Sequence, residues 1–262
     1  SKPVKIIVQQ SITGNIVGKD TTICYGQNPL SLIPLNAGPS NGNGTYQYQW
    51  LANTDNVTWT TAAPGTSTSA SYDPPSLTTT SYYQRFITSG RCINYSSTIT
   101  ITVLPLITNN VITPRPDSVI CQGSLFNLLP ATVPANGAGA GTYIFQWQDS
   151  TAAGTCQPAF GVNTGQSHQP DTAKFAFTES RYFRRVVYSG PDNVCKSVTT
   201  PILLTRYFKI RNNIIAADRT ICSGTVPAPL TGSTPIQGDG TYNYTWQQSA
   251  DGTTWSSNAT GT

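Results

Sequence analysis

The chain has 262 residues, enough for two or more domains of about 100 residues, and only 10% of these residues are charged. Glycine (22) and proline (19) are abundant, which disfavours long helices and favours turn-rich β structure. The net charge of +4 reflects 11 acids against 15 bases, so we expect no nucleic-acid partner. No apolar run approaches about 18 residues, so we expect no membrane span in this segment.

The first predicted element is a strand at Val4–Val8. It stands before Ile12 as Ile99–Val103 stands before Ile107. We therefore predict that residues 1–10 are the last strand of a preceding repeat, and that the sequence is part of a longer protein.

Residues 11–106 read as one immunoglobulin-like repeat. Tyr46, Tyr48 and Trp50 fall on every second residue, so they share one face of a strand, with Trp50 in the core. Further strands are expected at 81–85 and 99–103, with a cysteine on either side of the central tryptophan. This pattern predicts an all-β fold made of antiparallel immunoglobulin-like sandwiches.

The same landmarks return twice further along the chain, with a period of about 100 residues. The motif Asp-x-x-Ile-Cys ends at Cys24, Cys121 and Cys222, and the motif Gly-Thr-Tyr-x-x-x-Trp ends at the predicted core residues Trp50, Trp147 and Trp246. We predict a second repeat at 107–207 and a truncated third repeat at 208–262. Matching apolar and asparagine-containing segments that begin at Ile12, Ile107 and Ile210 are interpreted as short linkers between repeats.

Six cysteines allow many pairings, and the repeat favours one disulfide in each complete unit. We predict the pairs Cys24–Cys92 and Cys121–Cys195, which leaves Cys222 without a partner inside the sequence.

Cys156 stands nine residues after Trp147, where the first and third repeats have Trp59 and Trp255. We interpret Cys156 as a substituted structural position, unpaired within the sequence, rather than as a reactive or metal-binding thiol.

The sequence contains no set of residues that indicates catalysis. The single histidine, His168, aligns with Tyr72 of the first repeat, and a phenol cannot replace a general base. The densest basic set is interpreted as a solvated sheet face; it comprises Arg181, Arg184, Arg185, Arg206, Lys209 and Arg211. We predict that the chain is not an enzyme and has no catalytic, metal-binding or cofactor-binding residues, and no cofactor.

The unit as a whole resembles the repeats of large immunoglobulin-like surface adhesins of Bacteroidetes, the family of SprB-like gliding-motility adhesins. The resemblance rests on the first cysteine, Gly44–Trp50, the Tyr-Tyr-x-Arg segment ending at Arg85, the second cysteine and the Ile99–Val103 strand. It implies type IX secretion, an extracellular location on the bacterial cell surface, and a part in attachment or gliding.

Four Asp-Ser or Asp-Thr pairs resemble the O-glycosylation motif of exported proteins in that phylum. The candidate acceptors are Thr21, Ser118, Ser150 and Thr172. The alternative for the recurring Asp20, Asp117 and Asp218 is a turn role, in which the carboxylate accepts backbone N–H groups before a strand.

We therefore predict a non-catalytic stalk or adhesion segment whose partners are neighbouring repeats of the same chain. Surface polysaccharide or other surfaces would be reached through other parts of the protein. Two alternatives remain open: an array of carbohydrate-binding modules that uses exposed aromatics such as Trp59, and a polymerising extracellular fibre subunit that exchanges a donor strand.

Overall fold

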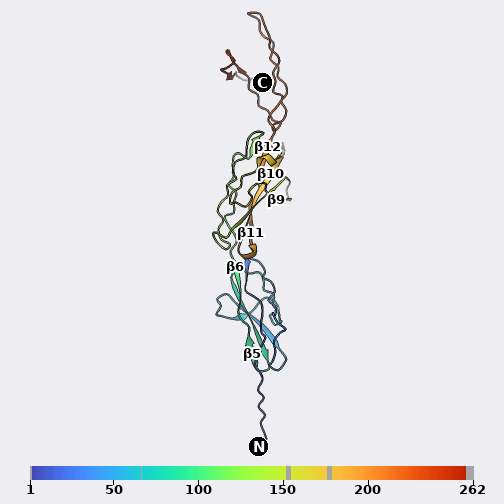
Figure 1. The fold of residues 1–262 in the computed structure, drawn as a ribbon, viewed down its shortest axis with the longest axis vertical. Coiled ribbons are helices and arrows are strands. Elements are labelled where there is room, and N and C mark those ends of the chain that lie inside the picture. Colours follow the sequence, from blue (N-terminus) through green and yellow to red (C-terminus); the bar gives the residue numbers. More distant parts are fainter. Residues whose placement is uncertain (1, 66, 152–154, 176–178, 258–262) are drawn as a thin grey trace.

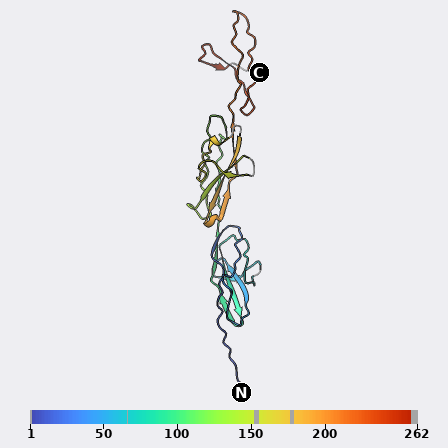
Figure 2. The ribbon, with the colours of Figure 1, turned by 45° about the vertical axis from the view of Figure 1, so that its right-hand side comes forward.

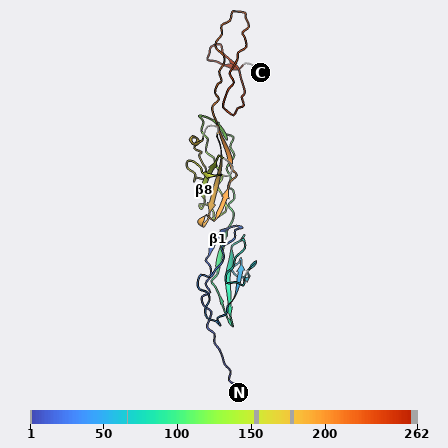
Figure 3. The same cartoon turned by 90° about the vertical axis from the view of Figure 1, so that its right-hand side faces the viewer.

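A computed structural model describes residues 2–65, 67–151, 155–175 and 179–257. The chain forms three units placed end to end, with its termini at opposite ends of an elongated molecule (Figure 1). The rotated views show the same linear arrangement (Figures 2 and 3). In the described ranges the helical pieces are two short 3₁₀ turns, η1 (Thr172–Lys174) and η2 (Pro191–Asn193), so the predicted all-β class is confirmed.

The first sandwich has one well-formed sheet in the order β1-β6-β4-β2-β3, with β5 also paired to β4. Strand β1 lies parallel to β6, and the other pairs are antiparallel. The strands are β1 (Thr21–Cys24), β2 (Gln47–Asn53), β3 (Thr60–Thr61), β4 (Ser81–Ser89), β5 (Cys92–Tyr95) and β6 (Ile99–Leu104).

A second layer covers this sheet and is held by isolated antiparallel bridges. They join the segments after Ile12, around Leu32 and around Tyr72, through the pairs Thr13–Ser40, Val17–Pro34 and Leu32–Tyr72. Side chains from both layers meet in one core around Trp50, whose indole is fully buried. Its ring lies 6.0 Å from that of Tyr72, and its Nε1 donates to the Ser69 carbonyl.

The second sandwich repeats this topology in the order β7-β12-β10-β8-β9, with β11 paired to β10. Its core is built around the buried Trp147, whose Nε1 donates to the Gly165 carbonyl. The strands are β7 (Val119–Cys121), β8 (Ile144–Ser150), β9 (Gln157–Pro158), β10 (Glu179–Ser189), β11 (Cys195–Val198) and β12 (Ile202–Tyr207).

The third unit has only part of this architecture in the described residues. Bridges Arg211–Ile236 and Ile215–Gly232 form, and a short hairpin joins β13 (Gln247–Gln248) to β14 (Ser256–Ser257). Trp246 is half-buried and lines an open trough of about 930 Å³. The prediction of a core tryptophan is therefore confirmed at Trp50 and Trp147 but wrong at Trp246, because no counterparts of β4 and β6 cover it within residues 208–257.

The segments interpreted as linkers belong to the sandwiches. Ile12 and Ile107 are buried, and Asn15 lies in the core of the first unit. The connection between the first two units is short: β6 ends at Leu104, and Thr108 is already bridged to Ala135 in the second. The exact domain boundaries stay predictions.

Candidate functional site

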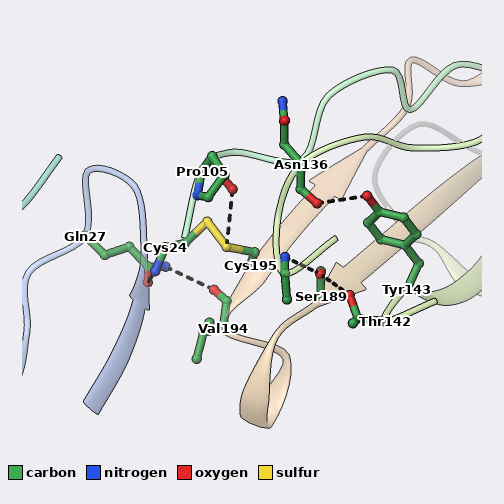
Figure 4. The surroundings of a disulfide bond; sticks show 10 residues. Cys24, Gln27, Pro105, Asn136, Thr142, Tyr143, Ser189, Val194 and Cys195 are labelled. Atoms are coloured by element: carbon green, nitrogen blue, oxygen red, sulfur yellow. Dashed lines mark hydrogen bonds between the residues drawn. A yellow bond between two sulfur atoms is a disulfide. The ribbon is translucent and has the colours of Figure 1, made fainter. Parts of the chain in front are cut away.

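The junction between the first two sandwiches carries a disulfide bond from Cys24 to Cys195. Cys24 ends β1 in register with Leu104, so it lies at the C-terminal end of the first sandwich. Cys195 opens β11 just after the turn from β10, so it lies at the N-terminal end of the second. The two Cα atoms are 5.1 Å apart, and the bond spans 171 positions of sequence (Figure 4).

The predicted pairs Cys24–Cys92 and Cys121–Cys195 are therefore wrong. In the first sandwich β5 starts at Cys92, and β6, which follows in the same direction after residues 96–98, reaches the level of Cys24 only at Leu104. Twelve residues of largely extended chain at about 3.3 Å each separate the two cysteines by up to roughly 40 Å, whereas a disulfide needs Cα atoms within about 7 Å. Within one repeat the two cysteines lie at opposite ends.

The same geometry separates Cys121 from Cys195. Cys121 is in register with Tyr207 at the end of β12, while Cys195 stands at the start of β11. Cys92, Cys121, Cys156 and Cys222 carry free thiols.

A small apolar cluster encloses the interrepeat disulfide. It is formed by buried Cys24, Ile107, Val187 and Cys195, with Leu104, Tyr143, Phe145 and Val194 packed around them. Gln27 Nε2 also donates to the Val194 carbonyl across the junction, at 3.5 Å (Figure 4). The bond is therefore protected from solvent by side chains of both units.

Close packing at this junction requires a glycine. Gly190 has a φ of 85°, and a Cβ at this position would lie 2.6 Å from Leu104 Cδ1. The positive φ strains any larger residue, and a Cβ would also force the Leu104 side chain to shift. The turn between β10 and β11 is thus shaped to accept the end of the preceding sandwich.

Each complete sandwich contains a buried arginine beside its core tryptophan. Arg85 is fully buried, donates to Asn15 Oδ1 (2.9 Å) and the Ala70 carbonyl (2.7 Å), and lies over the ring of Tyr48. Asn15 returns a bond from its amide to the Arg85 carbonyl, at 3.0 Å. Desolvation lowers the pKa of Arg85.

The second sandwich repeats this network. Arg185 donates to Asn110 Oδ1 and to the carbonyls of Gln166 and Thr132, at 2.7 to 3.0 Å. Burial lowers its pKa to about 10. Asn15 and Asn110, in the segments interpreted as linkers, therefore accept hydrogen bonds from buried arginines. The sequence interpretation missed this role.

The interpretation of the basic set as a solvated face is wrong for its members in β10 and β12, whereas Lys209 and Arg211 are exposed. Arg185 is fully buried, and Arg181 forms an ion pair with the buried Asp149 at 3.2 Å. Arg206 donates to the carbonyls of Thr172 and Phe175. These three side chains stabilise the interior of the second sandwich, and their burial and pairing leave them less available to an external polyanion.

His168 occupies the place of Tyr72, as the alignment predicted. Leu129–His168 is bridged in the second unit as Leu32–Tyr72 is in the first, and the imidazole stacks on Trp147 at 5.4 Å. The ring is fully buried, with Nδ1 3.0 Å from the Val162 carbonyl. Burial lowers its pKa, so the folded protein holds this imidazole in the neutral form.

This burial predicts acid sensitivity of the second sandwich. Below the ordinary histidine pKa of about 6.5 the unfolded chain binds a proton that the folded chain does not, so stability falls as pH falls through that value. We expect His168→Tyr to reduce this dependence. The test is the urea concentration at which β8 peptides lose protection from hydrogen–deuterium exchange, measured from pH 7.5 to about 5. An equal change of this midpoint with pH in the variant and the wild type would contradict the prediction.

The candidate acceptors for O-glycosylation differ in accessibility. Thr21 is exposed and Ser118 half-buried, but Ser150 is 4% and Thr172 5% exposed. Thr172 Oγ1 also accepts the Phe126 N–H. Ser150 and Thr172 are therefore wrong as sites on the folded protein, because a sugar at either would displace core packing. Thr21 and Ser118 stay predictions.

The three recurring aspartates have different surroundings. Asp20 precedes β1, and its Oδ1 accepts a backbone N–H at 2.8 Å, but the donor is Thr100 of β6 rather than a residue of a local turn. Asp117 instead binds Arg115, whose hydrogen bond lowers the pKa of this carboxyl. Asp218 is exposed. Of the described side chains, none form a group of three or more that could ligate a metal, and no described helix is long and apolar enough to cross a membrane.

Several solved structures resemble the chain at low sequence identity. Domains of titin share 10% identity, with 76% of this chain and 68% of that chain covered and a TM-score of 0.42. Sidekick-1 immunoglobulin domains 1–5 share 14% identity, with 84% of this chain but only 44% of that chain covered and a TM-score of 0.30. Human protocadherin-24 domains share 11% identity, with coverage of 78% and 99% and a TM-score of 0.32. The fold assignment rests on the sheets described above.

No curated protein matches the chain. A family model described as "Domain of unknown function (DUF8696)" matches residues 13–105 and 211–262, more than half of the sequence. Both matched ranges begin one residue after an equivalent isoleucine, Ile12 or Ile210. The chain therefore belongs to the DUF8696 family.

Proposed function

We propose that the chain is a non-catalytic stalk segment of an exported surface protein, in which immunoglobulin-like repeats locked end to end hold an adhesive part away from the cell. The observation that carries the proposal is the Cys24–Cys195 bond between neighbouring repeats. A disulfide inside one domain would stabilise that domain alone. A disulfide across a junction also fixes how two domains are placed and transmits tension between them.

The bond changes the path that tension takes along the chain. The covalent path between the two termini runs through Cys24, the disulfide and Cys195, so residues 25–194 lie outside it and add no length when they unfold. The short connection at Pro105 and the packed cluster around the bond restrict bending at the same place. Both properties suit a spacer that must keep its length.

The cellular setting extends this proposal. Disulfides persist in oxidising compartments, which supports an extracellular location. The resemblance to SprB-like adhesins of Bacteroidetes adds type IX secretion, display on the bacterial surface and a part in attachment or gliding. Thr21 and Ser118 are the acceptors that an O-glycosylated stalk would offer.

Single-molecule extension tests the load path directly. With the full chain held at both termini under oxidising conditions, complete unfolding should give a contour about 60 nm shorter than in Cys24→Ser, because 171 positions at about 3.5 Å each stay outside the load path. Reducing the wild type should restore this length. Equal contours before and after reduction would contradict the proposed stalk mechanics.

The polymerising-fibre alternative has its own signature in the same samples. Val4, Ile6 and Val8 are each at least 85% exposed, and the trough beside Trp246 is open. Filaments in electron micrographs of the purified chain, lost in Ile6→Lys, would favour strand exchange over a stalk built within one chain.

A further inference from the structure

We propose that a disulfide joins every pair of successive repeats, from the first cysteine of one repeat to the second cysteine of the next, and that the Cys24–Cys195 bond is one of them. Such an interrepeat disulfide is called a staple below. Cys121 and Cys92 are then halves of further staples of the same kind. The inference deepens the proposed stalk and rests on it for its purpose, but bond connectivity tests it separately from mechanics.

The C-terminal ends of the two complete sandwiches have the same geometry. After Cys24, the Tyr25 N–H donates to the Leu104 carbonyl at 2.8 Å; after Cys121, the Gln122 N–H donates to the Tyr207 carbonyl at 2.8 Å. The turn that follows is also shared, since the carbonyls of Cys24, Cys121 and Cys222 each accept an N–H at 3.1 Å. The difference is that Cys24 is buried by the next repeat, whereas Cys121 is exposed.

The N-terminal ends match as well. Cys195 Sγ lies 3.9 Å from the Pro105 carbonyl oxygen, and Cys92 Sγ lies 3.6 Å from that of Gln10. Pro105 and Gln10 both stand two residues before the isoleucine that begins their sandwich. Their carbonyls also accept an N–H from equivalent glycines, at 3.2 and 3.1 Å.

The glycine that shapes the occupied junction has its counterpart beside Cys92. Gly90 has a φ of 60°, and a Cβ there would lie 2.8 Å from Gln9 Oε1. Gly190, at the occupied junction, has a φ of 85° and faces Leu104 in the same way. The end of the first sandwich that carries Cys92 therefore has the same construction as the end of the second sandwich that carries Cys195 and contacts the first sandwich.

The occupant that fits this end is the C-terminal end of another repeat of this family, which presents a cysteine on its first strand. Two thiols form the bond, releasing two protons and two electrons. A small disulfide such as oxidised glutathione accepts the electrons by exchange and leaves as two thiols. Neither sandwich has to change its fold for this reaction.

Staples of this kind overlap along the chain. The loop closed by Cys24 and Cys195 contains Cys92 and Cys121, so a bond from Cys121 to the following repeat begins inside the loop of the bond before it. An array built in this way stays covalently connected after a single backbone cut inside a closed loop. Neighbouring repeats would then be linked by disulfides as well as by the backbone, unlike independent domains joined by the backbone alone.

Duplicating residues 10–207 in place tests the inference, because Tyr207 is then followed by Gln10, which is equivalent to Phe208. The chain is refolded with reduced and oxidised glutathione, free thiols are alkylated, and peptides are mapped without reduction. We expect Cys24–Cys195 in both copies and a new bond from Cys121 of the first copy to Cys92 of the second. Cys121→Ser in the first copy should leave that Cys92 alkylated.

Formation of Cys24–Cys195 in each copy reports that the sandwiches have folded. If both form while Cys121 and the second Cys92 are recovered as free thiols, or if Cys92 pairs within its own repeat, the inference is overturned. Duplicating residues 105–207 instead gives an independent second chain, in which Cys121 of the first copy should bond to Cys195 of the second. Cys156→Ser, at a thiol outside both ends, should change neither map.

Discussion

Replacing Arg85 with methionine is expected to destabilise the first sandwich by about 3 kcal/mol, although methionine keeps most of the apolar stem. The guanidinium is the donor to Asn15 Oδ1 and the Ala70 carbonyl, and a buried acceptor left without a donor costs about 1–3 kcal/mol. The contact of the cation with the ring of Tyr48 is lost as well. Urea denaturation, followed by hydrogen–deuterium exchange of peptides from β2 and β4, measures the change in the free energy of unfolding.

A double-mutant cycle separates the network from simple loss of volume. Asn15→Leu alone should also be destabilising, because it leaves a buried cation without its Nε acceptor. In the double variant both partners are gone, so the loss should be smaller than the sum of the single losses by at least about 1 kcal/mol. Arg91→Met, on an exposed arginine of the same sandwich, should change stability by less than about 0.5 kcal/mol. Strict additivity would contradict the network.

The buried position of Arg85 could have been predicted from strand parity. Every second residue of β4 is buried, namely Ser81, Tyr83, Arg85, Ile87 and Ser89. Once Tyr83 is assigned to the core, Arg85 must follow it. The sequence interpretation assigned no burial to Arg85, and it placed Arg185 on a solvated face because arginine usually prefers solvent.

The cysteine pairing could not be obtained by treating each repeat in isolation. The repeat correctly predicted the sandwich and its core residues Trp50 and Trp147, because alternation and period depend on local sequence. Which ends of the sandwich the cysteines occupy depends on the parallel pairing of β1 with β6, a contact between residues far apart in sequence. Burial of Ser150 and Thr172 depends on such tertiary contacts too, and a three-residue glycosylation motif carries no information about them.

Cys195→Ser and Cys92→Ser should have very different effects, although both remove the second cysteine of a complete repeat. Cys195 closes a loop of 171 positions, for which the chain-entropy relation gives about 5 kcal/mol, so its loss should lower stability by several kcal/mol under oxidising conditions. Cys92 is a free thiol, and its replacement should change stability by less than about 0.5 kcal/mol. Urea denaturation of both variants, with and without reductant, measures this asymmetry.

The double variant Cys24→Ser/Cys195→Ser completes the test. Because one bond accounts for both cysteines, it should be no less stable than Cys24→Ser alone, and a reductant should affect neither. Pairing within repeats would instead make Cys92→Ser as costly as Cys24→Ser and would leave Cys24 insensitive to the loss of Cys195. Hydrogen–deuterium exchange should further show that breaking the bond exposes amides on both sides of the junction, near Leu104 and Val187. The reason is that the cluster enclosing the disulfide is formed by side chains of both sandwiches.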